Sequence, residues 1–534
     1  MSYSLKASSI SRTGMQTASR FWNSHSTVSI KDTNLEDSGI PLDVRDDKVA
    51  ISKSENHCMI CGVSGRGKTR RELYPTVVMS ARAKKSLIVA DMKGEIFRHT
   101  AEEVKRCGHE VIIINLRNPQ KSNHYSPFSI VEDYWKQGDK SRATILLKDI
   151  CSIITAKIHC EKDSYWELAA QDVIAGFALF LLEQEAELTF NNIHRLFNEY
   201  FRDKEDRSVF NRAFNVDAES YKRLSTVLNL EADNTLSCIV SEVNTALSPF
   251  VDQESVRGLL SCSEINLKSI GKKPTAVYLI CPDESTSLYG IASLLIEQSY
   301  SELIAYADSR DDNILPVKVD FILDEFGCFV GSAWPNKLTA ARSRGIRFVL
   351  AIQAMSQIAA RYGENETRTI MSNCRTLIYM GGRDMRLINE ISILSGTKID
   401  DRTGIERPVL SINDLCTLKT GEIVVLDDSE LPFIGHVHDW KIWGIKNRTG
   451  SLEVNQNRTD TETVNLKNLL GISEENDQEI DDYEPEIESR SEQPKGSAMT
   501  IKDILKGIED NSDFVEYLNE IAEKNRTNDD EESQ

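Results

Sequence analysis

Residues 62–69 read Gly62-Val63-Ser64-Gly65-Arg66-Gly67-Lys68-Thr69, a complete G-x-x-x-x-G-K-[ST] phosphate-binding loop that directly follows the apolar run 57–61. A strand that ends in such a loop and then opens a helix presents backbone N–H groups to the phosphates of a nucleotide. We therefore expect all eight residues to line a nucleotide site. Lys68 should reach the β- and γ-phosphates of ATP, and the Thr69 hydroxyl should be a ligand of Mg²⁺. The alternative, a glycine-rich turn that matches by accident, does not explain the strand before the loop and the helix after it.

A second motif, Val319-Asp-Phe-Ile-Leu-Asp-Glu325, supplies groups that hydrolysis needs beyond binding. Asp324, at the carboxyl end of a buried strand, fits an aspartate that orients Mg²⁺. Glu325 fits a general base that orients the attacking water. An acidic pair at a strand end can also cap a helix, and that interpretation would be preferred if the pair stood alone. The phosphate-binding loop upstream favours the catalytic one.

Two further residue types that assist phosphoryl transfer follow this pair. Gln353 ends the next expected strand, where its amide can hydrogen-bond the γ-phosphate or the attacking water. Arg342 and Arg344 stand just before that strand, and either is a candidate for an arginine that reaches the nucleotide of a neighbouring subunit. Arginines before a strand are common surface residues, so the residues alone leave this choice open.

Apolar runs that alternate with helical segments predict a parallel sheet covered by helices. The helix after the loop should run over 68–84, with a break or kink at Pro75. Between about 125 and 270 the pattern is helical and strand-like runs are scarce, which predicts an all-α domain inserted into the sheet domain. The expected strands after the loop occupy residues 86–91, 111–116, 275–281, 317–323, 346–352, 376–380 and 421–426.

The negative charge of the chain is concentrated at its C-terminus. The net charge is −20 over 534 residues; beyond residue 470, 21 acidic and 6 basic residues give −15, so the rest carries only −5. A basic pore or groove in the body is therefore compatible with the composition. Residues 473–497 contain too few apolar side chains to offset the entropy of ordering, so we expect a disordered acidic tail. One amphipathic helical unit near 499–524 is the exception, and it docks either on a partner or on its own body.

Membrane, export and metal functions receive little support. No apolar run reaches the ~20 residues that cross a bilayer, and the N-terminus lacks the apolar region of a secretory signal, so we expect a flexible arm there. The 11 cysteines follow no repeated spacing, which suits a reduced cytosol. Cys58 and Cys61 are not expected to bind a metal, because residues three apart on a strand point to opposite faces.

In this order the motifs resemble those of the TraG/TraD-type coupling proteins of type IV secretion and conjugation systems, over roughly residues 40–440. By this resemblance Arg342 is the better arginine candidate, and the catalytic set is Lys68, Asp324, Glu325, Gln353 and Arg342. Ser126 departs from the family, which usually has Asn there. The further matching stretches are Asp91-Met-Lys93-Gly94-Glu95, Asn115-Leu with His124-Tyr125-Ser-Pro127, Asp163-Ser-Tyr-Trp166, Leu323-Asp-Glu-Phe326, Arg342-Ser-Arg-Gly-Ile346, and Gln353-Ala-Met-Ser-Gln357 with Tyr362-Gly363.

The resemblance implies an α/β fold: a RecA-like P-loop NTPase domain with an inserted all-α domain and a disordered acidic C-terminal tail. The expected boundaries are a flexible N-terminal arm over 1–45, the nucleotide-binding domain over 46–124 and 271–445, the all-α domain over 125–270, and the tail over 446–534.

The resemblance also implies a DNA-translocating ATPase that uses ATP and Mg²⁺ and forms a homo-hexameric ring. Its implied partners are single-stranded DNA with its relaxase and the channel proteins of a type IV secretion system. Most members of the family begin with transmembrane helices and this sequence shows none, so we expect a cytoplasmic protein held at the membrane through a separate anchoring protein. Two alternatives stay open: a coupling ATPase that delivers protein effectors, and a nucleotide-dependent cargo receptor or scaffold with incidental hydrolysis.

Overall fold

The computed structural model describes residues 14–156, 164–202, 215–228, 233–284, 286–331, 333–400, 404–427 and 430–445. The expected tail over 446–534, with its helical unit near 499–524, lies outside these residues, and so does Asp163.

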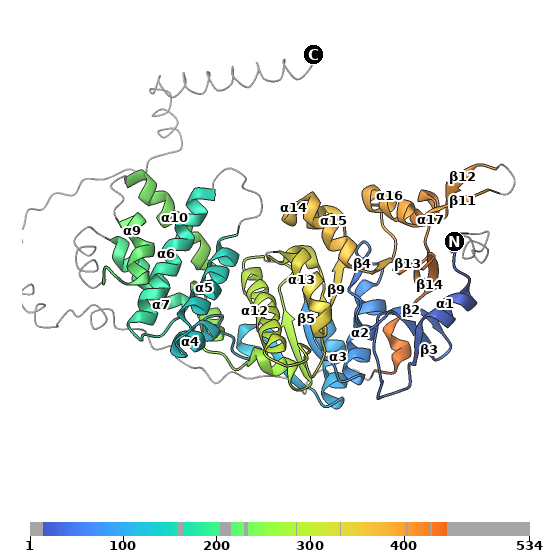
Figure 1. The fold of residues 1–534 in the computed structure, drawn as a ribbon, viewed down its shortest axis with the longest axis horizontal. Helices are drawn as coiled ribbons and strands as arrows, with labels where there is room; N and C mark the ends of the chain where they lie inside the picture. Colours follow the sequence, from blue (N-terminus) through green and yellow to red (C-terminus); the bar gives the residue numbers. More distant parts are fainter. Residues whose placement is uncertain are drawn as a thin grey trace, which may run out of the picture. The chain divides into compact units, whose positions relative to one another are not determined.

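A nine-stranded sheet runs through the described part of the chain in the order β14-β13-β10-β4-β9-β8-β5-β7-β6 (Figure 1). The seven strands from β10 to β6 are parallel, and β13 and β14 add an antiparallel edge. Strands from both sides of the helical insertion contribute, so the α/β fold class is confirmed. The strands are β4 (Cys58–Cys61), β5 (Ser86–Asp91), β6 (Glu110–Asn115), β7 (Thr275–Ile280), β8 (Val319–Leu323), β9 (Ile346–Ile352), β10 (Thr376–Tyr379), β13 (Glu422–Asp427) and β14 (Phe433–His436).

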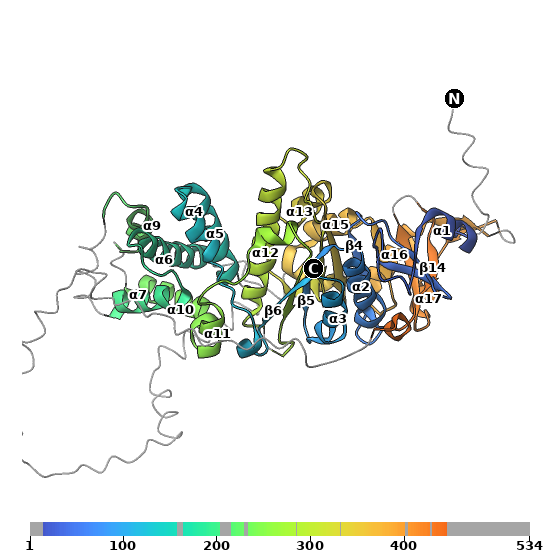
Figure 2. The same cartoon turned by 90° about the horizontal axis from the view of Figure 1, so that it is seen from below.

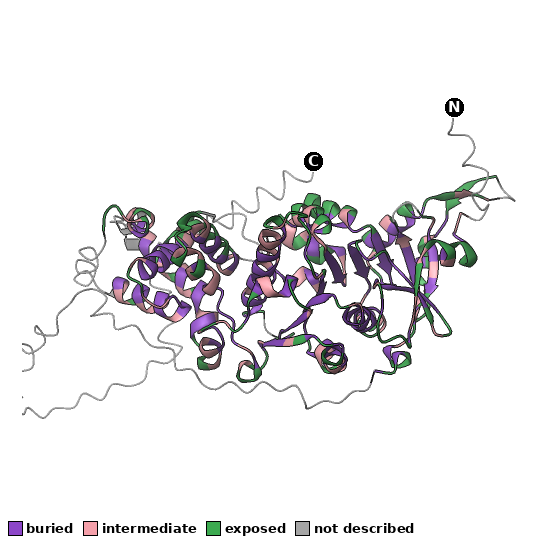
Figure 3. Cartoon of the chain, turned by 60° about the horizontal axis from the view of Figure 1, so that its bottom comes forward, coloured by how far each residue is buried: buried purple, intermediate pink, exposed green. Residues whose placement is uncertain are grey.

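Helices cover both faces of this sheet (Figures 1 and 2). Successive side chains of a strand point to opposite faces, so Leu87 and Val89 of β5 enter one core, and Ile88 and Ala90 enter the other. Figure 3 shows the strands buried between helices whose outer sides are exposed. One core is closed by α2 (Tyr74–Arg82) and α3 (Glu95–Arg106), and the other by α12 (Tyr289–Asp308), α13 (Trp334–Ala341), α14 (Met355–Tyr362), α15 (Glu364–Asn373) and α16 (Met385–Leu394).

The segment between β6 and β7 is helical, and α6 is its central helix. By length and composition, α6 is the one helix among the described residues that could cross a membrane: Tyr165–Glu183 has a mean hydropathy of 1.3, and 61% of its most apolar window is buried. Phe177 packs on Phe197 of α7, and a Cβ at Gly176 would lie 2.4 Å from Leu224 of α9, so α6 is packed as a core helix. The helices are α4 (Ser129–Lys136), α5 (Lys140–Thr155), α6 (Ser164–Glu183), α7 (Phe190–Arg202), α9 (Glu219–Leu228), α10 (Asp233–Val251) and α11 (Glu254–Leu259).

The N-terminal arm, expected to be flexible over residues 1–45, is folded from residue 14 onward. Helix α1 (Ala18–Ser24) precedes a small antiparallel sheet of β1 (Ser26–Ser29), β2 (Pro41–Arg45) and β3 (Lys48–Ile51). Phe21 stacks on Phe433 with ring centroids 3.8 Å apart, and His25 pairs with Asp427 at 3.2 Å. The expectation was wrong because the contacts that anchor α1 join residues some 400 positions apart, which no local pattern reveals.

Short elements near the C-terminal end were also missed. The strand pair β11 (Thr397–Ile399) and β12 (Glu406–Pro408) is largely exposed, and α17 (Ile412–Cys416) is a single short helix. Strand β14 contains a glycine, Gly435, where a Cβ would lie 1.9 Å from the carbonyl oxygen of Leu42. Such brief, polar or glycine-containing segments carry too few residues for a periodicity to be recognised.

The helix after the phosphate-binding loop changes type partway. It begins as a π-helical turn over Lys68–Leu73, in which the Tyr74 amide donates to the carbonyl of Thr69, five residues back. Pro75 lies in the first turn of α2, where its missing N–H removes no hydrogen bond from the helix interior. The expected break at Pro75 is therefore confirmed, and it takes the form of a π-to-α transition.

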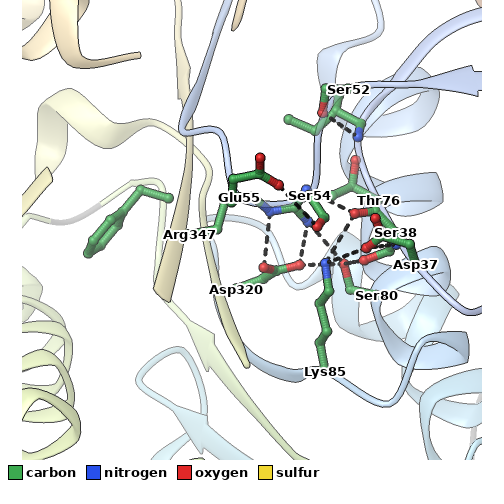
Figure 4. A network of polar contacts seen from close by, with 12 residues as sticks. Asp37, Ser38, Ser52, Ser54, Glu55, Thr76, Ser80, Lys85, Asp320 and Arg347 are labelled. Atoms are coloured by element: carbon green, nitrogen blue, oxygen red, sulfur yellow. Dashed lines mark hydrogen bonds and ion pairs between the residues drawn. The ribbon is translucent and has the colours of Figure 1, made fainter. Parts of the chain in front are cut away.

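A buried ion pair near the amino ends of β8 and β9 ties the N-terminal segment to the sheet (Figure 4). Arg347 Nε donates to Asp320 Oδ1 at 3.0 Å, and Ser80 donates to the same carboxylate at 2.7 Å. Lys85 and Arg347 both donate to the carbonyl of Ser38, at 3.1 and 3.4 Å. Burial alone would raise the pKa of Asp320, but the charges of Arg347 and Lys85 and the hydrogen bonds to this carboxylate hold the pKa below its usual value. Asp320 is therefore charged at neutral pH.

Asp320→Asn is expected to destabilise the fold by about 3–5 kcal/mol, because it leaves Arg347 as an uncompensated buried charge. The measurement is the urea midpoint of unfolding, followed by tryptophan fluorescence. Asp312→Asn is the matched control: it removes an exposed carboxylate paired with Arg310 and should leave the midpoint unchanged. Equal midpoints for Asp320→Asn and the parent chain would show that the buried pair contributes nothing.

Candidate active site

The carboxyl ends of β10, β4, β9 and β8, four neighbouring parallel strands, meet at one edge of the sheet. Adjacent strands lie about 4.8 Å apart, so residues that follow them come into contact. The phosphate-binding loop follows β4, the pair Asp324–Glu325 follows β8, and Gln353 follows β9. The structure thus brings together the residues that the sequence marked as catalytic, with the exception of Arg342.

Glycines determine the path of the phosphate-binding loop. Gly65 and Gly67 have φ of +83° and +91°, values that other residues rarely adopt. Gly62 packs closely on the loop after β10, because a Cβ there would lie 3.1 Å from Met380 Cβ. The amide of Gly62 donates to the Ile352 carbonyl and that of Val63 to the Gly381 carbonyl, both at 3.2 Å. The neighbouring strand ends therefore hold the loop from both sides.

Lys68 is folded back over this loop. Its Nζ donates to the Gly62 carbonyl at 2.6 Å, and the side chain is buried. Burial lowers the pKa of Lys68, while the carboxylates of Glu325 and Asp324 act in the opposite direction. The ammonium group consequently lies between the loop and two acidic side chains, where a terminal phosphate of a nucleotide would meet it.

Thr69 and Asp324 form an oxygen pair suited to Mg²⁺. The Thr69 hydroxyl donates to Asp324 Oδ2 at 3.4 Å. Burial first, and then the charge of Glu325, raise the pKa of Asp324 to about 7, and Lys68 opposes this shift. Mg²⁺ binds hydroxyl and carboxylate oxygens and completes its shell with water and phosphate oxygens, so this pair fits the ion that the sequence predicts. A divalent cation here would also favour the ionised form of Asp324.

Glu325 and Gln353 are in direct contact. The Gln353 side-chain amide donates to Glu325 Oε1, and both side chains are half-buried. Glu325 has φ of +54°, a left-handed conformation that costs a non-glycine residue of order 1–3 kcal/mol. This left-handed conformation changes the direction of the chain directly after the strand. The hydrogen bond from the Gln353 side-chain amide then fixes the orientation of the Glu325 carboxylate. The pair can therefore hold one carboxylate oxygen in place while the other accepts a proton from water.

Arg342 and Arg344 lie at the opposite end of β9 from Gln353. Arg344 pairs with Asp308 at 2.8 Å and donates to the Ala340 carbonyl, so it is engaged in holding α12 and α13 together. Arg342 is exposed, and among the described residues no hydrogen bond or ion pair of its side chain is found. The seven residues of β9, at about 3.3 Å each, separate it by roughly 20 Å from the phosphate-binding edge of its own chain.

The arginine side chains of the loop region bind residues that flank β13 and β14. Arg66 Nη1 donates to the Leu418 carbonyl at 2.9 Å, and Arg71 Nη1 donates to the Val437 carbonyl at 3.0 Å. Arg70 pairs with Asp439 at 2.9 Å. Of the eight expected loop residues, Arg66 therefore contributes its backbone to the phosphate edge and uses its side chain to bind the C-terminal segment.

The sequence interpretation missed the loop after β10 as part of this site. Gly381 has φ of +95°, accepts the Val63 amide and packs against the Arg66 guanidinium. Asp384 caps α16 by accepting the amides of Arg386 and Leu387. The glycine pair directly after the predicted strand 376–380 was the available signal, because two glycines at a strand end indicate a close approach of another backbone.

Two of the stretches that resemble motifs of the coupling proteins have structural roles. Asp91 accepts the amides of Lys93, Glu95 and Phe97 at the start of α3; burial raises the pKa of Asp91 to about 6, and these hydrogen bonds limit the shift. In the other stretch, Tyr125 donates to Gln298 Oε1 and the Gln298 amide donates to the Pro127 carbonyl, both at 2.8 Å. That stretch fastens the start of the helical insertion to α12.

The fold and the loop at its edge define a P-loop α/β protein of the RecA-like class. The chain belongs to the family described as type IV secretory system conjugative DNA transfer, whose model matches residues 6–403. The resemblance to TraG/TraD-type coupling proteins is thereby confirmed.

Individual proteins similar to this chain agree with the family assignment. Protein VirD4 of Rhizobium rhizogenes is 24% identical over 346 residues, which cover 61% of this chain and 47% of VirD4. Protein VirD4 of Agrobacterium fabrum is also 24% identical, covering 61% and 48%. The match therefore spans about half the length of these curated relatives.

Solved structures of a plasmid coupling protein share the fold. The structure of TrwB in complex with the non-hydrolysable ATP analogue ADPNP has a TM-score of 0.60 at 14% identity and covers 83% of this chain and 96% of TrwB. The structure of TrwB with ADP and Mg²⁺ has a TM-score of 0.57 at 16% identity, covering 76% and 91%.

Proposed function

We propose that this chain is the coupling ATPase of a conjugative type IV secretion system, which binds and hydrolyses ATP with Mg²⁺ to recruit single-stranded DNA with its relaxase and drive it into the transfer channel. The observation that carries the proposal is the convergence of Lys68, Thr69, Asp324, Glu325 and Gln353 at one sheet edge. Family membership and the nucleotide complexes of TrwB support it.

In the proposed reaction, the loop amides and Lys68 bind the β- and γ-phosphates. Thr69 and Asp324 hold Mg²⁺, which neutralises charge on the phosphate oxygens. Glu325 accepts a proton from the attacking water, and Gln353 keeps the Glu325 carboxylate oriented toward that water. Each residue thereby performs one task that its contacts already suit.

Arg342 is assigned to a neighbouring subunit's site. Because it lies at the far end of β9 from its own loop, it can stabilise the transferring phosphoryl group only in trans. A head-to-tail arrangement that closes on itself forms a ring, and we propose a homo-hexamer with nucleotide at its interfaces and DNA in its channel.

The chain would act at the cytoplasmic side of the membrane, held there by channel proteins and by a separate anchoring protein. Its contacts to DNA would be mainly to phosphates and independent of sequence, because the same cargo channel must accept any transferred strand.

Stimulation of turnover by single-stranded DNA tests this function. We expect the ATPase rate of the full chain to rise severalfold with an unstructured oligonucleotide and to lose this stimulation as salt increases from about 50 to 200 mM, because counterion release drives phosphate contacts. Free nucleotides at the same phosphate concentration are the control. ATPase activity that DNA leaves unchanged would favour a coupling ATPase for protein effectors, and transfer that persists in Glu325→Gln would favour a nucleotide-dependent scaffold.

A further inference from the structure

Lys93 follows β5 at the sheet edge of the proposed nucleotide site, and the described residues give its ammonium group no structural role. In the stretch Asp91-Met92-Lys93-Gly94-Glu95, Asp91 caps α3 and Glu95 accepts a hydrogen bond from the Tyr74 hydroxyl at 3.4 Å. The Lys93 side chain is exposed, and within the described ranges no hydrogen bond or ion pair of its Nζ is found. Lysine binds phosphate groups as a point charge on a flexible stem, so an exposed ammonium group at this position suits an anionic ligand.

Strand pairing places Lys93 at the acidic side of the site. Strand β5 neighbours β8, with Ala90 opposite Leu323, and the Asp324 amide donates to the Ala90 carbonyl at 3.2 Å. Lys93 follows this point by three residues, at the same sheet edge as Asp324.

The negative charges at this edge would exceed the charge of Lys68 once a triphosphate binds, so a second cationic side chain would stabilise the complex. Lys68 faces the carboxylates of Glu325 and Asp324. Arg66 is engaged with the Leu418 carbonyl, and Arg342 lies at the far end of β9. An incoming triphosphate adds further negative charge, and the γ-phosphate carries the largest share and must lie next to the water that Glu325 orients.

We propose that Lys93 binds the γ-phosphate and lets the site distinguish a nucleoside triphosphate from a diphosphate. The inference rests on the proposed function, since it assumes that the phosphate-binding loop holds the β-phosphate. A diphosphate lacks the group that Lys93 contacts, so this residue contributes to triphosphate affinity alone. Lys68, in contrast, serves both nucleotides through the β-phosphate.

The test compares the affinities of the full chain for Mg²⁺-ADP and for Mg²⁺ with a non-hydrolysable ATP analogue. Lys93→Met should weaken binding of the ATP analogue about tenfold or more, the effect of losing one charge-assisted hydrogen bond, and should change ADP affinity less than about twofold. Lys93→Arg should recover most of the difference. Lys105→Met, which removes an exposed cation from the last turn of α3, the helix that follows Lys93, should change neither affinity.

Each outcome separates this inference from the function on which it rests. If the parent chain binds neither nucleotide, the proposed function fails and the inference fails with it. If the parent binds both and Lys93→Met keeps the same ratio of the two affinities, the proposed function stands and the γ-phosphate assignment is wrong. Equal weakening of both nucleotides would mean that Lys93 supports the loop rather than the terminal phosphate.

Discussion

Glu325→Gln is expected to bind ATP with the affinity of the parent chain and to hydrolyse it at least about a hundredfold more slowly, because an amide cannot accept the proton of the attacking water. The substitution keeps the size of the side chain and its contact with Gln353, so nucleotide binding should persist. The measurement pairs nucleotide binding with steady-state phosphate release in the same preparation.

Lys68→Ala is the informative contrast to this variant. It removes the ammonium group that we propose binds the phosphates, so binding should weaken and turnover should disappear together. The two variants thus separate binding from chemistry. Parent-level hydrolysis by both variants would mean that the proposed site is not where the reaction occurs.

A mixture of Arg342→Ala and Lys68→Ala chains is expected to hydrolyse ATP although neither variant does so alone. When equal amounts of the two variants mix randomly in a head-to-tail ring, about a quarter of the interfaces pair an intact phosphate-binding loop with an intact arginine. An arginine that stabilises phosphoryl transfer contributes about 10³–10⁵ in rate. Activity from this fraction of interfaces should therefore be readily detected above the rate of either variant alone. The measurement is phosphate release as a function of the mixing ratio.

Arg344→Ala provides the control for Arg342. Arg344 is held by Asp308 and the Ala340 carbonyl, so its loss should alter packing between α12 and α13 without reproducing the complementation pattern. Mixing must be done under conditions in which the parent chain is shown to form rings. A mixture that stays inactive under those conditions argues against action in trans.

Local patterns predicted the central sheet well because its strands are buried on both faces. The expected strands 86–91 and 346–352 coincide with β5 and β9, and the others differ by one or two residues at an end. The acidic pair and the glutamine could be placed at one edge because carboxyl ends of parallel strands converge there. The residues alone did not show whether Arg342 or Arg344 is available to reach a neighbouring subunit. The structure shows that Arg344 pairs with Asp308, a contact that no sequence spacing predicts.

The regions that sequence reasoning missed are those that long-range contacts stabilise. Helix α1 has seven residues and no strong pattern of its own, yet Phe21 and His25 dock it on β14 and β13, some 400 residues further along the chain. The loop after β10 was recognised only as the end of a strand, although Gly381 holds the phosphate-binding loop. Such contacts depend on tertiary packing rather than on propensity.

The hydrogen bonds from Arg66 and Arg71 to the carbonyls of Leu418 and Val437 couple the phosphate-binding loop and its helix to the segments that flank β13 and β14. The stretch after Val437 adds to these contacts, because Asp439 pairs with Arg70 and the side chains of Trp440 and Trp443 are buried. A displacement of this stretch would therefore be transmitted to the hydrogen bonds that hold the phosphate-binding loop. Nucleotide binding in the loop and a movement of this stretch would then alter the same few hydrogen bonds, so each would report on the other.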